Sequence, residues 1–306
     1  MDAGGTKLLA GVILDDLTVG HRVRRLWGGG DRTEVLNTMV EAVVSAGDAS
    51  AVGFGIPALL DFAAGVSVSS VHLPLADFAF RSFMEERLGV PVFVDNDANL
   101  AALAEQRVGA ARGASSVVML TLGTGIGSGI LLGGRLFRGT SGAGGEIGHM
   151  TIDEHGPPCQ GTCPGRGCLE VMASGTAIGR EGTDAGRREP ESALGRAVAQ
   201  RGFVTGEEVT ALAVAGDAAA CSVMAATGRS LGAGLASVVN IFEPEVIVIG
   251  GGASAAGDLL LDPAREIVAQ RALRPSRDHV RIVPALLGEE AGMVGAGIFA
   301  LADGEI

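Results

Sequence analysis

Residues 1–16, MDAGGTKLLAGVILDD, and residues 120–134, LTLGTGIGSGILLGG, share one pattern. In each stretch a turn of glycine and threonine lies beside apolar runs of strand length. Such a turn joins strand to strand, whereas a Walker A loop or a G-x-G-x-x-G loop opens a helix. The repeated pattern predicts two similar halves that face one another across a cleft.

The rest of the chain alternates between short apolar runs and longer segments of helical pattern. Strands are predicted at 7–16, 51–56, 90–95 and 245–252, and helices at 32–47, 97–113 and 221–242. Asp97 can cap the second of these helices, and the Thr205/Glu208 spacing is a capping box. This alternation favours an α/β fold with partly parallel sheets.

Composition limits the class of protein. Of 306 residues, 47% are hydrophobic and 19% are charged, which is enough apolar material for one large or two ordinary domains. The 49 glycines cluster between apolar runs, which indicates sites lined by backbone. The formal net charge of −12 argues against a nucleic-acid partner, which would require a face rich in Lys and Arg.

The uncharged stretch between Arg112 and Arg135 is long enough to span a membrane. Glycine occupies every second position from Gly123 to Gly129, where a spanning helix would be weakest. The chain also opens without a basic segment followed by an apolar one. We therefore expect a cytoplasmic protein that does not insert into membranes.

Glycine–threonine turns are suited to phosphate, because glycine lets backbone N–H groups converge on an anion and threonine adds a hydroxyl donor. A third glycine run follows a predicted strand at residues 250–252. Tight hairpins use the same residue types, and this is the alternative for each turn alone. Taken together, the three segments favour a nucleotide-binding cleft.

The segment VDNDANLAALAE places two carboxylates, Asp95 and Asp97, at the end of a predicted strand, where α/β proteins hold their ligands. Beside a phosphate site, such a carboxylate can accept a hydroxyl proton during phosphoryl transfer. The alternative is helix capping by Asp97 or Asn96.

Three of the four cysteines lie within residues 144–170, GGEIGHMTIDEHGPPCQGTCPGRGCLE. Clustered cysteines near a histidine in a cytosolic chain favour a metal site over disulfides. Reduced free thiols are the alternative, and His155 is a competing ligand.

The motifs DAGGTK, NDANLAALAE, LGTGIGSG, GGEIGHM and CPGRGCLE together resemble the ROK family of sugar kinases and sugar-responsive repressors, over essentially the whole chain. The resemblance implies an α/β fold of two ribonuclease-H-like (actin-like ATPase) domains around a nucleotide and sugar cleft. It places an N-terminal domain at 1–111, with a C-terminal helix at about 291–306 returning to it. A C-terminal domain at 112–290 would contain a zinc loop at 149–168.

The resemblance also implies roles for individual residues. Asp97 is expected to be the catalytic base, and the sugar is expected to contact Asn96, Glu146, His149 and Glu170. The residue expected to position Mg²⁺ is Asp2. The phosphates and adenosine of ATP are expected to contact Gly4, Gly5, Thr6, Lys7, Gly123, Thr124, Gly125, Gly250, Gly251 and Gly252. A structural Zn²⁺ is expected to have tetrahedral ligation by His149, Cys159, Cys163 and Cys168.

Several positions depart from the family pattern. The family usually has C-x-C where this chain has CQGTC, which makes Cys163 the least certain zinc ligand. His72 and Leu75 stand near where glucose kinases of the family have Asn and Trp, and Ala58 replaces a common glycine. Only Met1 precedes Asp2, so a trimmed or misassigned start is expected, because a core strand needs several residues.

The resulting expectation is an ATP-dependent kinase that phosphorylates a hexose at its 6-hydroxyl, with glucose as the substrate and a homodimer as the assembly. The alternatives are a kinase for N-acetylmannosamine or N-acetylglucosamine, a non-catalytic ROK sugar sensor and a zinc-stabilised scaffold. A ROK repressor would need a DNA-binding segment ahead of the first phosphate turn, and the acidic composition opposes it.

Overall fold

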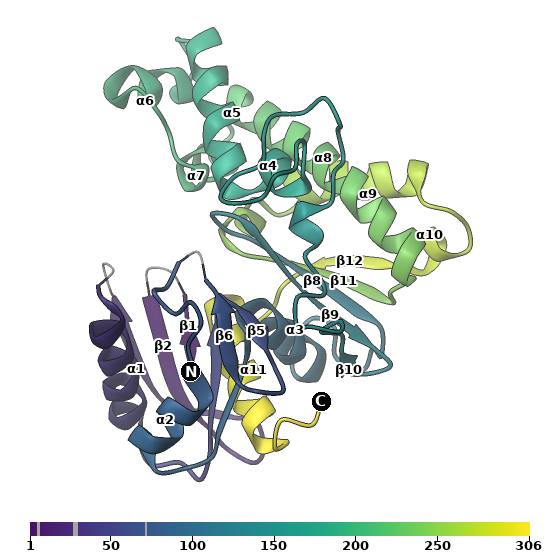
Figure 1. Cartoon of the computed structure of the whole chain (residues 1–306). Helices are drawn as coiled ribbons and strands as arrows, with labels where there is room; N and C mark the ends of the chain where they lie inside the picture. Colours follow the sequence, from purple (N-terminus) through teal and green to yellow (C-terminus); the bar gives the residue numbers. More distant parts are fainter. Residues whose placement is uncertain (5–6, 27–29, 71) are drawn as a thin grey trace. The chain divides into compact units, whose positions relative to one another are not determined.

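The computed structural model describes residues 1–4, 7–26, 30–70 and 72–306 (Figure 1). The chain divides into two compact units, of which the first comprises residues 1–119, 129–145 and 286–306. The second unit comprises residues 120–128 and 146–285. Residues 112–119 and 129–145 thus belong to the first unit, whereas the sequence boundary at 111 assigns them to the second domain.

The first unit is built on a five-stranded mixed sheet in the order β3-β2-β1-β4-β7. Its strands are β1 (Asp2–Ala3), β2 (Lys7–Ile13), β3 (Val19–Leu26), β4 (Val52–Ile56) and β7 (Val92–Asn96). The first three form an antiparallel meander, and β4 and β7 continue it in parallel with β1. A separate hairpin pairs β5 (Leu59–Asp61) with β6 (Val66–Ser69).

The helices of this unit are α1 (Arg32–Ala46), α2 (Phe80–Leu88), α3 (Asp97–Arg107) and α11 (Ala291–Leu301), with a short turn η3 (Gly288–Glu290). A capping box between Asp31 and Glu34 begins α1, which ends at Ala46, one residue before the end of the predicted range. Helix α11 packs closely on α3 and β4, because Gly295 faces a backbone carbonyl of α3 and Gly53 of β4 faces one of α11. A side chain at either glycine would force the elements apart.

The second sheet has the order β10-β9-β8-β11-β12. Its strands are β8 (Val117–Leu122), β9 (Ile126–Leu132), β10 (Arg135–Leu136), β11 (Val246–Gly250) and β12 (Arg281–Pro284). Counted along the chain, both sheets have their strands in the order third, second, first, fourth, fifth. This repeated order confirms the prediction of two similar halves.

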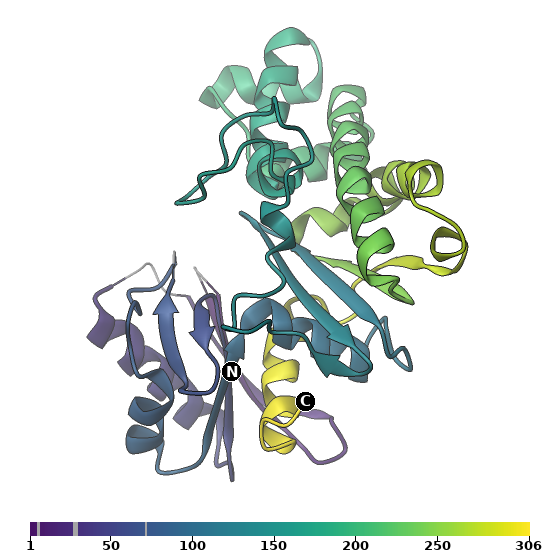
Figure 2. The ribbon, with the colours of Figure 1, turned by 45° about the vertical axis from the view of Figure 1, so that its right-hand side comes forward.

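The second unit also contains most of the helices. They are η1 (Ile147–His149), α4 (Leu169–Ala173), α5 (Gly175–Arg188), α6 (Ala193–Arg201), α7 (Gly206–Val214), α8 (Ala218–Phe242), η2 (Gly252–Ala256), α9 (Asp258–Arg271) and α10 (Ser276–His279). Helices α8 and α9 lie side by side (Figures 1 and 2), because Gly228 and Gly232 of α8 leave room for the backbone of α9. The predicted capping box of Thr205 and Glu208 begins α7.

The structure corrects one local prediction and decides between two alternatives at another place. The helix predicted over 97–113 ends at Arg107, where the Glu105 carboxylate accepts the N–H of Ala110 and turns the chain. Asn96, rather than Asp97, is the N-cap of this helix, since its side chain accepts the N–H groups of the first turn.

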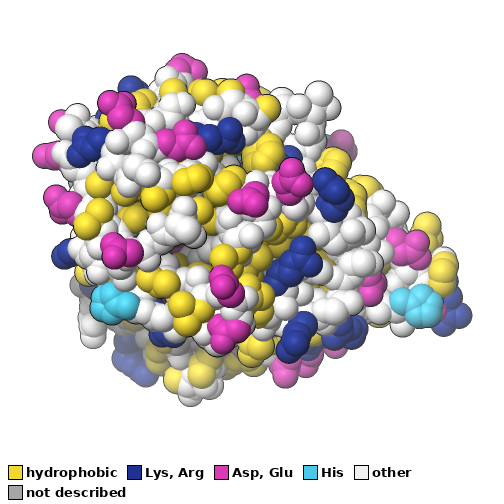
Figure 3. Space-filling model, turned by 90° about the horizontal axis from the view of Figure 1, so that it is seen from below, with side chains coloured by type: hydrophobic (Ala, Val, Ile, Leu, Met, Phe, Trp, Pro, Cys, Tyr) yellow, Lys and Arg dark blue, Asp and Glu magenta, His cyan; other side chains and the backbone are white. Residues whose placement is uncertain are grey.

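The stretch between Arg112 and Arg135 contains the strands β8 and β9 and no helix. Among the described residues, no single helix has the length and apolar character needed to cross a membrane; α7 and α8 meet those two criteria only as a pair bent by 115°. On the face in Figure 3, acidic and basic side chains are interspersed with hydrophobic ones, so the charge of that face is mixed.

Candidate functional site

The junction between β7 and α3 carries the predicted catalytic carboxylate. Asn96 ends β7, and its Oδ1 accepts the N–H of Ala98 at 2.9 Å and that of Asn99 at 3.3 Å. Asp97 is the first residue of the helix, and its Oδ1 also accepts the N–H of Ala98 at 2.9 Å. Because Asn96 supplies the cap, α3 does not depend on the Asp97 carboxylate for its start.

Asp2 lies on the neighbouring part of the same sheet, in β1. Burial and the negative charge of Asp97 raise the pKa of Asp2 to about 7, against the smaller opposing effects of the N-terminal amine and Lys7. Gly292 of α11 makes room for this carboxylate, since a Cβ there would lie 2.6 Å from the Asp2 Cγ. Two negative carboxylates close together repel one another, and a cation bound beside them would offset this repulsion.

Only part of the first phosphate loop can be described. Gly5 and Thr6 lie outside the described residues, and Gly4 stands directly before them. The ammonium group of Lys7 forms an ion pair with Glu289 at 3.0 Å, and both side chains are partly exposed. Lys7 is therefore held at the start of β2 by a partner from η3.

The second predicted phosphate turn, Gly123–Gly125, joins β8 to β9 and is closely packed. The Thr124 carbonyl accepts the Thr176 hydroxyl at 2.7 Å and the Gln160 side-chain amide at 3.3 Å. Gly175 donates its N–H to the Gly123 carbonyl at 2.7 Å. The carbonyl groups of the turn are thus held by donors from residues that are far from it in the sequence.

Glu170, predicted to bind the sugar, also supports this turn. Its Oε2 accepts the N–H of Ile126 at 2.8 Å, and a Cβ at Gly125 would collide with the same oxygen. A side chain at position 125 would therefore have to displace the Glu170 carboxylate from this contact. A Cβ at Gly123 would meet no atom within 4 Å, so close packing does not explain why position 123 is a glycine.

The glycine run at 250–252 follows the end of β11. Gly251 has φ +82° and lies against the backbone of Leu122, where a Cβ would approach the Leu122 N at 2.5 Å. Its carbonyl accepts the Ser254 hydroxyl at 2.7 Å. The run therefore brings the ends of β8 and β11 together, while Gly252 has open space around it.

The four predicted zinc ligands form one cluster. One ligand atom from each of His149, Cys159, Cys163 and Cys168 lies within 4.8 Å of the others. His155 is not among them, and its side chain is 88% exposed. The longer CQGTC spacing therefore still brings Cys163 to the other ligands.

The cluster has the dimensions of a zinc site. Bond lengths of about 2.3 Å to sulfur and about 2.05 Å to nitrogen give tetrahedral edges of about 3.8 Å and about 3.6 Å. The distance from Cys159 Sγ to His149 Nδ1 is 3.6 Å, and that from Cys163 Sγ to Cys168 Sγ is 4.0 Å. At Gly165 a Cβ would lie 2.9 Å from the Cys168 sulfur, so glycine makes room for the sulfur cluster.

Burial and the neighbouring thiols raise the pKa of Cys159 to about 12, and burial raises that of Cys168. Ligation to a divalent cation favours the thiolate form and would oppose these shifts. Isolated antiparallel β-bridges pair Thr151 with Cys168 and Pro158 with Arg166, and they hold the loop that carries the ligands.

Glu146 stands next to the metal loop. Its Oε2 is 4.0 Å from His149 Nε2, the ring nitrogen that does not face the cysteines. Partial burial raises the pKa of Glu146, and the charge of Glu170 adds to this, while His149 opposes it. Within the second unit, Glu146 thus feels the charges of His149 and Glu170, two of the other three residues predicted to contact the sugar.

Sequence reasoning missed Arg138 and Gly292. Arg138 follows β10 and binds the buried Asp95, a contact between positions 43 residues apart. Gly292 was visible only as one of several small residues in the last helix. The signal available for Arg138 was a single basic residue after a short apolar run, which surface residues also show.

The model of the ROK family matches residues 1–303, and the chain belongs to this family. It is 40% identical over 254 residues to a glucokinase of Halalkalibacterium halodurans, covering 83% of this chain and 76% of the relative. It is 33% identical over 302 residues to a glucokinase of Thermotoga maritima, covering 97% and 94%.

Among solved structures, a ROK family glucokinase from Streptomyces griseus in complex with glucose and AMPPNP has a TM-score of 0.87 to this chain. The two are 32% identical, and the alignment covers 98% of each. The predicted fold class, α/β with two ribonuclease-H-like (actin-like ATPase) domains, is confirmed.

Proposed function

We propose that this protein is an ATP-dependent hexose kinase that converts glucose to glucose 6-phosphate. The observation that carries the proposal is the Asp97 carboxylate at the start of α3, in electrostatic contact with Asp2 and on a helix that Asn96 caps. Membership of the ROK family and identities of 33–40% to glucokinases support the same activity.

Asp97 acts as the general base. It accepts the proton of the sugar 6-hydroxyl as the oxygen attacks the γ-phosphorus, and the bond to the β-phosphate oxygen breaks to release ADP. Asn96 orients the sugar next to it. When bound, Mg²⁺ neutralises charge on the phosphates, and Asp2 is the residue that positions it.

The two glycine–threonine segments bind the phosphates of ATP. Backbone N–H groups of Thr124 and Gly125 donate to phosphate oxygens, Lys7 adds a positive charge and Thr124 adds a hydroxyl, while the Gly123 N–H holds the turn by donating to the Gly125 carbonyl at 3.0 Å. Gly250, Gly251 and Gly252 bind the adenosine. The packing of Gly125 against Glu170 and of Gly251 against Leu122 supports preformed backbone for this purpose.

Glu146, His149 and Glu170 bind sugar hydroxyls, and the metal loop orients them. The cluster of His149, Cys159, Cys163 and Cys168 fits a structural Zn²⁺. Ligation through His149 Nδ1 leaves the Nε2 proton to a sugar hydroxyl or to Glu146, which fixes the tautomer of the ring.

The decisive assay measures ADP release with ATP, Mg²⁺ and a panel of sugars that includes glucose, mannose, N-acetylmannosamine and N-acetylglucosamine. Glucose should give the highest kcat/KM, and the product should carry phosphate on its 6-oxygen. A preference for an N-acetylated sugar would instead assign the alternative kinase activity, for which His72 and Ala58 are the first positions to vary.

Asp97→Asn tests the base directly. We expect the variant to fold and bind sugar while kcat falls about 10²- to 10⁴-fold. Asp77→Asn is the matched control, because Asp77 has φ +49° and asparagine accepts that conformation. Turnover by Asp97→Asn close to that of the control would refute the assignment.

The resemblance implies a homodimer, a cytoplasmic location and a place in glycolysis. Light scattering on purified protein tests the first of these.

A further inference from the structure

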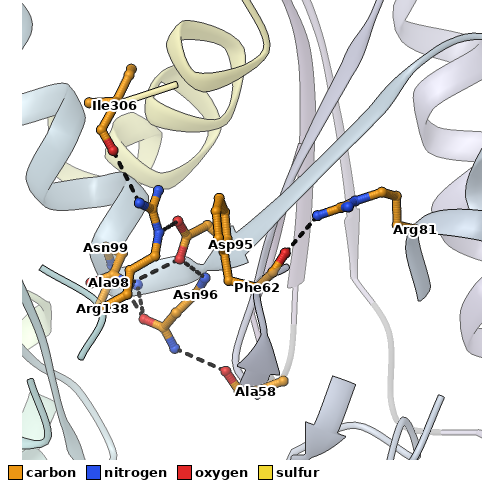
Figure 4. A network of polar contacts seen from close by, with 9 residues as sticks. All are labelled: Ala58, Phe62, Arg81, Asp95, Asn96, Ala98, Asn99, Arg138 and Ile306. Carbon is orange, nitrogen blue, oxygen red and sulfur yellow. Dashed lines mark hydrogen bonds and ion pairs between the residues drawn. The ribbon is translucent and has the colours of Figure 1, made fainter. Parts of the chain in front are cut away.

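A buried ion pair lies directly behind the catalytic segment. Arg138 Nε donates to Asp95 Oδ2 at 2.7 Å, and the two side chains are only 14% and 3% exposed. Asp95 immediately precedes Asn96 in β7, whereas Arg138 comes from the segment after β10. Figure 4 shows the pair at the centre of a network of polar contacts.

Arg138 is held on several sides. Its guanidinium carbon lies 4.0 Å from the centroid of the Phe62 ring and 5.4 Å from that of Phe299. Its Nη1 donates to the backbone oxygen of Ile306 at 3.1 Å. Packing of this kind holds the guanidinium group in one orientation, so that its positive charge lies beside one oxygen of Asp95.

The other carboxylate oxygen of Asp95 accepts hydrogen bonds from one residue before Asp97 in the sequence and from one residue after it. Oδ1 accepts the N–H of Asn96 at 2.7 Å and the side-chain amide of Asn99 at 3.0 Å. Asn99 is itself buried. Asp97 therefore lies between two residues that the Asp95 carboxylate holds, and Asn96 in turn caps the helix on which Asp97 stands.

We propose that Asp95 and Arg138 are positioning residues for phosphoryl transfer, which hold Asn96 and Asp97 in the geometry needed for proton abstraction. This inference rests on the proposed kinase function. A buried ion pair is a poor source of stability, because apolar residues of similar volume often do as well or better. A misplacement of about 1 Å in a catalytic group can lower the rate by about 10²-fold, so orientation is a sufficient reason for the pair.

The test is a double-mutant cycle with Asp95→Leu, Arg138→Met and the double variant, in which melting temperature, kcat and both KM values are measured. Each single change should lower the melting temperature sharply, because it leaves a buried charge without its partner. The double variant should regain the part of the melting temperature that the unpaired charge costs, but not the part lost with the Asn99 hydrogen bond, while its kcat stays about 10- to 100-fold below wild type. Its KM for ATP should be unchanged.

A double variant that regains both stability and kcat would overturn the proposal, since the pair would then be structural only. Arg138→Lys covers the case in which the double variant does not fold. It keeps the charge and loses the planar stacking on Phe62, so kcat should fall several-fold in a folded protein, and an unchanged kcat also overturns the proposal.

Arg22→Met is the matched control, since Arg22 forms an ion pair with Glu290 at 2.8 Å in which its side chain is 49% exposed. Its melting temperature and kcat should both stay close to wild type. Failure of the proposed kinase function would give a different result. Wild-type protein would then show no kinase activity, while the melting temperatures of the single and double variants would still differ as described.

Discussion

Replacing Asp2 by asparagine should make the protein more stable at neutral and alkaline pH. Burial, reinforced by the charge of Asp97, raises the pKa of Asp2 from 3.8 to about 7. A pKa difference of one unit between the folded and unfolded chain is worth about 1.4 kcal/mol. Asparagine has a similar shape and carries no charge at any of these pH values.

The direction follows from which state binds the proton more tightly. The folded protein keeps the Asp2 proton up to about pH 7, whereas the unfolded chain releases it near pH 4. The stabilisation from this proton is therefore complete below about pH 4 and is lost as the pH rises through 7. Between pH 5 and pH 8, wild type should lose about 2–3 kcal/mol relative to Asp2→Asn.

Urea unfolding of both proteins at several pH values from 5 to 8 measures this difference. Asp16→Asn is the control, because Asp16 is exposed and hydrogen bonds from Thr18 lower its pKa, so any slope has the opposite sign. Mg²⁺ with a nucleotide should flatten the wild-type slope, since a bound cation favours the charged carboxylate. Parallel pH profiles for wild type and Asp2→Asn would show that the pKa of Asp2 is not raised in the folded protein.

Three further changes test the second unit and the packing of the first. Thr124→Val should raise the KM for ATP about 10-fold or more and that for sugar much less, because a hydroxyl bound to a charged phosphate is lost; equal effects on both substrates would count against the phosphate turn. Cys168→Ser should lose zinc and raise the sugar KM about 10- to 100-fold, with a smaller rise for ATP because Gln160 of the metal loop contacts the Thr124 carbonyl. Zinc loss without a change in sugar KM, with Cys221→Ser as control, would reduce the loop to a structural role. Gly295→Ala should lower the free energy of unfolding by about 1–3 kcal/mol, because its Cβ meets a carbonyl oxygen of α3; unchanged urea unfolding would show that the helices can move apart.

Much of the fold could be predicted from the sequence, because the deciding interactions are local. The capping boxes at Asp31/Glu34 and Thr205/Glu208 span three residues, and strand β4 is a continuous apolar run. The turn Gly123–Gly125 was visible from its glycine spacing, and it lies between two strands as expected. The cysteine spacing also predicted a cluster, since a short loop can bring its own ends together.

Other features depended on which distant segments meet. Capping of α3 by Asn96 rather than Asp97 was left open by the sequence, because both residue types accept the same N–H groups and the path of β7 decides between them. Residues 129–145 belong to the first unit because β9 packs on α3, where Gly129 leaves room for the Ala98 carbonyl. A single boundary in the sequence cannot describe a chain that enters the second unit at residue 120 and comes back to the first unit at residue 129.

The Asp95–Arg138 pair shows the same division most clearly. The order of residues alone places a carboxylate at the end of β7, next to Asn96 and Asp97. The three-dimensional packing is what brings Arg138 to this carboxylate, against the rings of Phe62 and Phe299. An ion pair of this kind forms only where apolar packing removes water from both charges, and packing between residues far apart in the chain leaves no periodic mark in the sequence.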